Sequence, residues 1–141
     1  RYDLPWDAGT LQEMYRRSGD YRPAMEKVVA SLARDHGIRS VILSNMVPES
    51  AKVWEQYLRS NPFAPSPRLY SGWHGWLKPE PAAFHAVMEY SPFLAPYTYI
   101  LVDAAKNNCD AARKEGWQTI HYKTHSGFLS DLGYYINSVE D

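Results

Sequence analysis

Two hydrophobic patterns alternate along this chain. In the first, short runs of four to seven residues without helical spacing have the character of strands; these runs are 38–44, 68–71, 97–103 and 118–122. In the second, apolar residues recur every three or four positions, as in helices with one buried face; these stretches are 23–36, the segment opened by Pro48, the segment after Pro79 and Pro81, 107–115 and 127–139. Strands separated by helices favour βα units, so we expect one α/β domain with a mostly parallel sheet.

Single residues support the predicted helix ends and buried faces. Pro23 suits a first helical turn, and Gly37 suits the left-handed position after a helix end. The spacing predicts these buried residues: Met25, Val28, Val29, Leu32 and Ala33; Val53, Trp54, Tyr57 and Leu58; Ala83, Phe84, Val87 and Met88; Phe128, Leu132, Tyr135 and Ile136. The segment 72–76, GWHGW, predicts a glycine-rich turn with buried indoles, with a partner-facing patch as the alternative.

Composition narrows the class of protein. A length of 141 residues suffices for one core, and a net charge of −1 gives no electrostatic reason to expect nucleic acid or an anionic membrane as partner. No apolar stretch approaches the roughly 20 residues that cross a bilayer. The single cysteine, Cys109, cannot form an internal disulfide, and no N-x-Ser/Thr site occurs. These features favour an intracellular compartment, either the cytoplasm or an organelle matrix.

Three polar positions follow the predicted strands. Ser44 and Asn45 end the first strand, Lys78 lies in the loop after the second, and Asp103 ends the third. Ligands of open α/β sheets bind beyond the carboxyl ends of the strands. A hydroxyl, an ammonium and a carboxylate at one edge would suit a phosphate with Mg²⁺. The alternative is that these residues only end strands, which polar residues do in any protein.

The order and spacing of these positions are more specific. VILSNMVPES, GWLKPEPAAFHAV and ILVDAAKNNCDAARKEGW resemble the second, third and fourth motifs of the haloacid dehalogenase-like (HAD) hydrolase superfamily. The resemblance runs from about residue 21 to the C-terminus. It implies a Rossmann-like three-layer sandwich over 21–141, with 1–20 as an irregular lead-in or a remnant of a cap.

The resemblance also implies roles for particular residues. In the family, the first of two aspartates in an Asp-x-Asp motif attacks phosphorus and forms an aspartyl-phosphate. Ser44, with Asn45, would bind the phosphoryl oxygens, and Lys78 would steady the transferring group. Asp103 and Asn108 fall at positions from which the family's fourth motif reaches Mg²⁺.

This sequence departs from the family pattern at two places. No strand ends in Asp-x-Asp, because the acids of YDLPWDAGT, Asp3 and Asp7, lie four apart with Pro5 between them. Ala104 stands at the usual metal-ligand position, and a methyl group cannot coordinate Mg²⁺. We therefore expect Asp103 to cap the strand and contact Lys78 or a backbone amide, and we expect Mg²⁺ only if Asp103 serves it alone.

The missing motif has a structural consequence. In the family its strand lies between the strands that here end in Ser44 and Asp103. Without it, buried backbone groups would lack partners, at roughly 1–3 kcal/mol each. We expect the strand to come from residues upstream of Arg1 or from a partner chain. Otherwise the two strands must pair directly in a rebuilt sheet.

Two functions remain open from the sequence. The first is a catalytically degenerate HAD-like domain that serves as a binding or structural subunit of a larger assembly. The second is a Mg²⁺-dependent phosphohydrolase whose nucleophile lies upstream or on a partner; a metal-free dehalogenase is a more distant variant. The five histidines show no metal-ligand spacing. Cys109 is expected in the core, with a reactive thiol at a helix start as the alternative.

Overall fold

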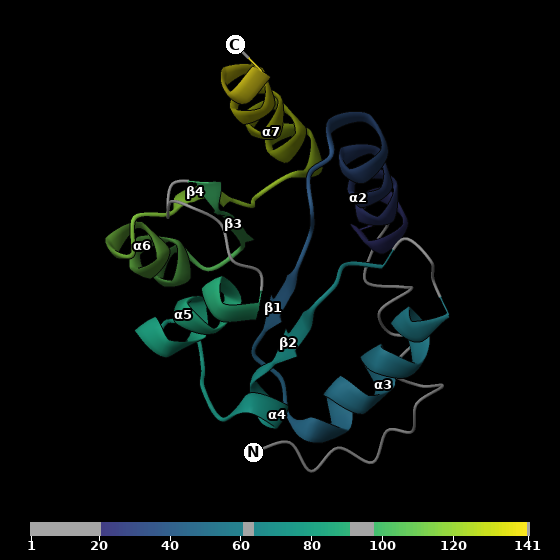
Figure 1. Cartoon of the computed structure of the whole chain (residues 1–141), viewed down its shortest axis with the longest axis vertical. Coiled ribbons are helices and arrows are strands. Elements are labelled where there is room, and N and C mark those ends of the chain that lie inside the picture. Colours follow the sequence, from purple (N-terminus) through teal and green to yellow (C-terminus); the bar gives the residue numbers. More distant parts are fainter. Residues whose placement is uncertain (1–20, 61–63, 91–97, 141) are drawn as a thin grey trace. The chain divides into compact units, whose positions relative to one another are not determined.

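The structure is a computed structural model that describes residues 21–60, 64–90 and 98–140 (Figure 1). The predictions for residues 1–20, including Asp3 and Asp7, lie outside these ranges. The chain divides into two compact units, Arg1–Trp76 and Leu77–Asp141, and each is described here by itself. Within the described ranges, no helix is long and apolar enough to cross a membrane.

The described part of the first unit contains three helices and two strands. They follow in the order α2 (Tyr21–His36), β1 (Ile42–Ser44), α3 (Pro48–Arg59), β2 (Arg68–Tyr70) and α4 (Ser71–His74). The strands β1 and β2 are parallel, with Ile42 opposite Arg68 and Ser44 opposite Tyr70. The predicted strand 38–44 is thus present but begins later, at Ile42.

The second unit repeats the alternation of strand and helix. Its described elements are α5 (Pro81–Tyr90), β3 (Ile100–Asp103), α6 (Lys106–Lys114), β4 (Gln118–His121) and α7 (His125–Glu140). The strands β3 and β4 are parallel, with Ile100 opposite Gln118 and Asp103 opposite His121. Parallel pairs joined through helices confirm the predicted α/β class.

The parallel strands form two sheets of two strands each, β1 with β2 and β3 with β4. The third option from the sequence, direct pairing between the strands that end in Ser44 and Asp103, concerns strands of different units and stays a prediction. The three residues of β1 are only half-buried, whereas the sequence predicted a buried strand. A short strand with one paired edge is covered less completely than the middle strand of a sheet.

The helices of the first unit bury fewer residues than their patterns predicted. In α3, Val53 and Leu58 are buried as expected. In α2, Leu32 is buried, but Ala33 is exposed, which corrects the prediction. Ala33 lies about 100° round the helix from Leu32 and therefore at the margin of the apolar face. Other predicted positions are half-buried, namely Met25, Val28, Val29, Trp54 and Tyr57.

The indoles of 72–76 have different environments. Trp76 is buried and its ring stacks on His74, whereas Trp73 is 48% exposed. The prediction of buried indoles is therefore right for Trp76 and wrong for Trp73. Gly75 takes the left-handed conformation (φ 81°) and ends α4 between the two rings, so they do not share a helical face.

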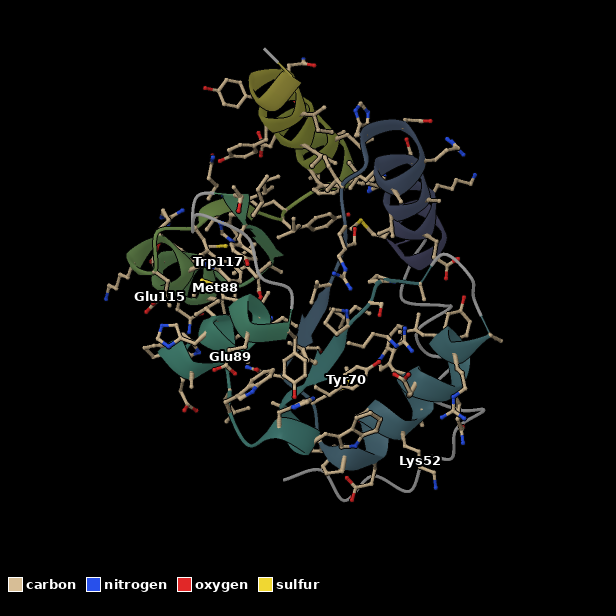
Figure 2. All side chains as sticks on the ribbon, in the orientation of Figure 1. Lys52, Tyr70, Met88, Glu89, Glu115 and Trp117 are labelled. Carbon is tan, nitrogen blue, oxygen red and sulfur yellow. The ribbon has the colours of Figure 1, made fainter. Side chains whose placement is uncertain are left out.

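The core of the second unit follows the sequence pattern more closely. Ala83, Phe84 and Val87 of α5 are buried, as is Phe128 of α7. Trp117, labelled in Figure 2, stacks on Tyr99 at 5.0 Å between ring centroids and meets the ring of Phe84 edge-on at 5.3 Å. Such aromatic contacts use part of the aromatic residues, which make up 14% of the chain. Half-buried positions among those predicted are Met88, Leu132, Tyr135 and Ile136.

Candidate functional site around Asp103

The carboxylate of Asp103 ends β3 and receives three hydrogen bonds. Its Oδ1 accepts the backbone N–H of Ala105 at 2.8 Å. Its Oδ2 accepts the Lys78 ammonium at 2.6 Å and the Asn108 side-chain amide at 3.2 Å. The side chains of Lys78 and Asp103 are only 10% and 11% exposed. The site is therefore a nearly buried ion pair in which both carboxylate oxygens are engaged.

The local sequence explains how these groups meet. Ala105 precedes α6 in an extended conformation and has no side chain that can cap the helix. The Asp103 carboxylate satisfies the Ala105 N–H instead, as an Asx-type turn does. Asn108 lies in the first turn of α6 and is itself buried, so its amide reaches back to the same carboxylate. Lys78 comes from the loop before α5.

The hydrogen bonds to Asp103 set its ionisation. Burial alone would raise the pKa of Asp103, because a charged group is poorly solvated there. The hydrogen bonds from Lys78, the Ala105 amide and Asn108, together with the charge of Lys78, outweigh burial and hold the pKa below its ordinary value. Asp103 is therefore a carboxylate at neutral pH and not a proton donor.

These contacts can be compared with the sequence predictions. The expected contacts of Asp103 with Lys78 and with a backbone amide are confirmed. Asn108 joins the same cluster. Ala104 is exposed, and its carbonyl oxygen lies 2.9 Å from His121 Nε2. The sequence did not predict this contact, since the spacing of His121 and Ala104 carries no motif.

Cys109 lies directly behind the site. Its side chain is fully buried, and Sγ lies 3.7 Å from the backbone oxygen of Asp103. Burial, and next the negative charge of Asp103, raise the pKa of the Cys109 thiol. A raised pKa opposes thiolate formation, so the contacts support the predicted core residue and not the reactive thiol.

Ser44 and Asn45 belong to the first unit. Ser44 ends β1 and is half-buried, and Asn45 is exposed. The loop after them is fixed by Ser71, whose Oγ accepts the N–H of Met46 at 2.9 Å and lies 3.2 Å from the Met46 oxygen. The N–H of Gly72 donates to that same oxygen at 2.9 Å. The sequence did not single out Ser71, because a lone serine after a strand has no distinctive pattern.

The predicted site residues thus fall into two groups. Lys78, Asp103 and Asn108 are brought together in the second unit, whereas Ser44 and Asn45 stand in the first. In the described ranges, no three His, Cys, Asp or Glu side chains are grouped so that they could hold a metal ion. The Asp103 cluster can orient one ammonium and one carboxylate, and it presents a single acidic group.

Comparison with known proteins bears on the fold. No model of a known protein family matches the sequence, and no curated protein matches it. A crystal structure of an uncharacterized protein from Corynebacterium glutamicum is similar, with a TM-score of 0.72 and 24% sequence identity. The match covers 84% of this chain and 85% of that chain, so it includes residues of both units and the two chains are of similar length. At this identity the likeness concerns the fold alone.

Proposed function

We propose that this chain is a HAD-like domain that does not transfer phosphoryl groups by itself and serves as a binding or structural subunit of a larger assembly. The observation that carries the proposal is the state of Asp103. Both of its oxygens accept hydrogen bonds, and one lies 2.6 Å from the Lys78 ammonium. In the family pattern this position would help to hold Mg²⁺, and here the carboxylate is already neutralised.

The residues around Asp103 do not fit Mg²⁺. This ion takes six oxygen ligands in near-octahedral array, usually with one or two carboxylates among them. The side chain of the neighbouring Ala104 offers only a methyl group, and the Lys78 ammonium, 2.6 Å from Asp103 Oδ2, already engages that oxygen and neutralises its charge. This misfit supports the reading of a degenerate site.

The outer edges of β1 and β3 support the proposal that a further strand is supplied from elsewhere. Ile42 N–H donates to the Pro67 oxygen, and Gln118 N–H donates to the Tyr99 oxygen. Because hydrogen bonding alternates along a parallel ladder, the backbone groups of Leu43 on β1, and of Ile100 and Val102 on β3, face the opposite edges. We propose that an upstream segment or a partner chain adds a strand there and completes the three-layer sandwich that the resemblance implies.

The rival function is a Mg²⁺-dependent phosphohydrolase whose nucleophile lies upstream of Arg1 or on a partner. The convergence of Lys78, Asp103 and Asn108 favours it, since these are the residues that the resemblance assigns to the active centre. In this reading the Lys78–Asp103 pair is a resting arrangement that an incoming nucleophile strand would alter.

An activity assay separates the two functions. We expect the purified chain to hydrolyse no p-nitrophenyl phosphate above background, with or without Mg²⁺. The variant Ala104→Asp supplies the second acid of the fourth motif and tests whether that position alone limits activity. If the wild-type chain turns over with Mg²⁺ and Ala104→Asp changes nothing, the degenerate reading is wrong.

A binding measurement tests whether the chain retains the phosphate site that the resemblance implies. The resemblance assigns phosphate binding to Ser44, Asn45 and Lys78. Inorganic phosphate should therefore raise the thermal midpoint, by an amount equivalent to about 2.7 kcal/mol at one hundred times its dissociation constant. Sodium chloride at equal ionic strength is the control. Ser44→Ala should reduce the shift, and an unchanged shift in that variant would remove Ser44 from the site.

A further inference from the structure

In the described structure, strand β4 is paired along one edge only. Gln118 N–H donates to the Tyr99 oxygen at 3.0 Å, and Tyr122 N–H donates to the Asp103 oxygen at 2.9 Å. Because these bonds alternate along a parallel strand, Thr119 and His121 direct their backbone groups to the opposite edge. The Tyr135 hydroxyl donates to the Thr119 oxygen at 3.1 Å from that side. The Thr119 N–H and both backbone groups of His121 have no ladder partner among the described residues.

A groove of about 430 Å³ runs beside this edge. It lies wholly within the second unit, with strand residues on one side and α7 on the other. Its lining residues are Thr119, Ile120, His121, Lys123, Asp131, Tyr134 and Tyr135. Tyr134 is 71% exposed, which is unusual for an aromatic ring of this size. The groove therefore combines outward backbone groups with uncovered aromatic surface, as sheet edges that accept another strand do.

The charges in the groove favour a second copy of this chain as the occupant. A twofold axis brings one patch against itself, so charged residues on the patch meet opposite charges only if the patch carries both signs. Lys123 and Asp131 supply one of each. When two copies of a strand pair antiparallel, the residue on the twofold axis can donate its N–H to the same residue of the other copy and accept a hydrogen bond from it at its C=O. His121 directs its backbone N–H and C=O to the outer edge of β4 and can therefore be this residue. Pairing centred on His121 places Lys123 of one copy opposite Thr119 of the other, beside α7.

We propose that this chain forms a homodimer through antiparallel pairing of two β4 strands about a twofold axis at His121. The pairing makes a continuous four-stranded sheet in the order β3-β4-β4-β3. Lys123 of each copy meets Asp131 of the other, and the Tyr134 rings are covered. This proposal rests on the second unit alone and is independent of any catalytic or phosphate-binding role.

Sedimentation velocity of the 141-residue chain tests the proposal. The protein concentration is varied over roughly 1 to 500 µM, because small interfaces bind weakly. We expect a reversible monomer–dimer equilibrium. Lys123→Glu places two acids together at both symmetric contacts and should raise the dissociation constant roughly tenfold to a hundredfold. Asp131→Lys should do the same. The double variant restores opposite charges and should return the constant to within roughly threefold of wild type.

Lys114→Glu is the matched control, because Lys114 is exposed on α6 and does not line the groove. Far-ultraviolet circular dichroism checks that each variant is folded. If a charge reversal unfolds the chain, the neutral pair Lys123→Gln and Asp131→Asn replaces it, with a smaller expected increase in the dissociation constant. A chain that stays monomeric at every concentration, a dimer insensitive to Lys123→Glu, or a double variant without recovery would each overturn the proposal.

Discussion

Asp103, at the end of β3, connects the loop before α5 with the N-terminus of α6. Its carboxylate holds Lys78 from the loop before α5, the backbone at Ala105, and Asn108 in the first turn of α6. A buried charge of this kind is stable only while it is paired, because desolvation of an unpaired carboxylate is costly. The cluster therefore has a structural role whether or not it also binds a ligand.

Removal of the Lys78 charge should destabilise the chain. Lys78→Met leaves the Asp103 carboxylate buried without its cation, and we expect a loss of about 3 kcal/mol in the free energy of unfolding. The double variant Lys78→Met/Asp103→Asn should lose less, since the buried charge is then absent. Lys106→Met is the matched control: its ion pair with Asp110 is exposed, so urea unfolding should show little change. Equal losses at Lys78 and Lys106 would contradict the burial argument.

The same carboxylate should make stability depend on pH. The pKa of Asp103 is lowered in the folded chain, so its contribution is fully present above the unfolded value of 3.8 and is lost as pH falls through the folded value. Between about pH 7 and pH 3, the stability difference between wild type and Lys78→Met/Asp103→Asn should therefore shrink in the acid range. Other carboxylates titrate in both proteins and cancel in this difference. A constant difference across the range would show that Asp103 titrates normally.

At the scale of elements, loops are positioned by backbone contacts that hydrophobic patterns do not report. The loop after β1 is held by Ser71 Oγ and by the Gly72 N–H, both of which bond to Met46. This attachment fixes the segment that follows Ser44 and Asn45. The geometry of the candidate phosphate loop thus depends on residues some 25 positions later in the chain.

The backbone of the loop after β1 lies very close to Gly72, so substitution of Gly72 and of the uncrowded Gly133 should change stability in opposite directions. A Cβ at this position would lie 2.7 Å from the Met46 oxygen and the Pro48 nitrogen, both backbone atoms. Gly72→Ala should therefore cost about 1–3 kcal/mol of unfolding free energy. Gly133 lies in α7 with nothing within 4 Å of the same atom, so Gly133→Ala should stabilise by about 1 kcal/mol. Thermal or urea unfolding measures both, and a neutral Gly72→Ala would mean that the loop shifts freely.

At the scale of the whole molecule, the chain has two α/β units, each with a parallel strand pair. The crystal structure from Corynebacterium glutamicum shows that a chain of similar length adopts a similar fold at 24% identity. The proposed HAD-like assignment would add a central strand from elsewhere and an inactive centre, and the activity assay tests the second of these. The β4 groove adds a route to assembly that does not require that strand.

The sequence by itself determined the order and type of most described elements, because apolar spacing reflects which face of each helix or strand is buried. It placed a strand end and a turn where the structure has the short helix α4 (Ser71–His74). It also placed Lys78, Asp103 and Asn108 as candidates and predicted the contacts of Asp103 with Lys78 and a backbone amide, but not the contact with Asn108. Only the tertiary structure decided that Ala33 and Trp73 are exposed, that Ser71 anchors the loop after Ser44, and that the outer edge of β4 has no strand partner among the described residues. These features depend on which distant segments pack together, and local periodicity carries no record of that.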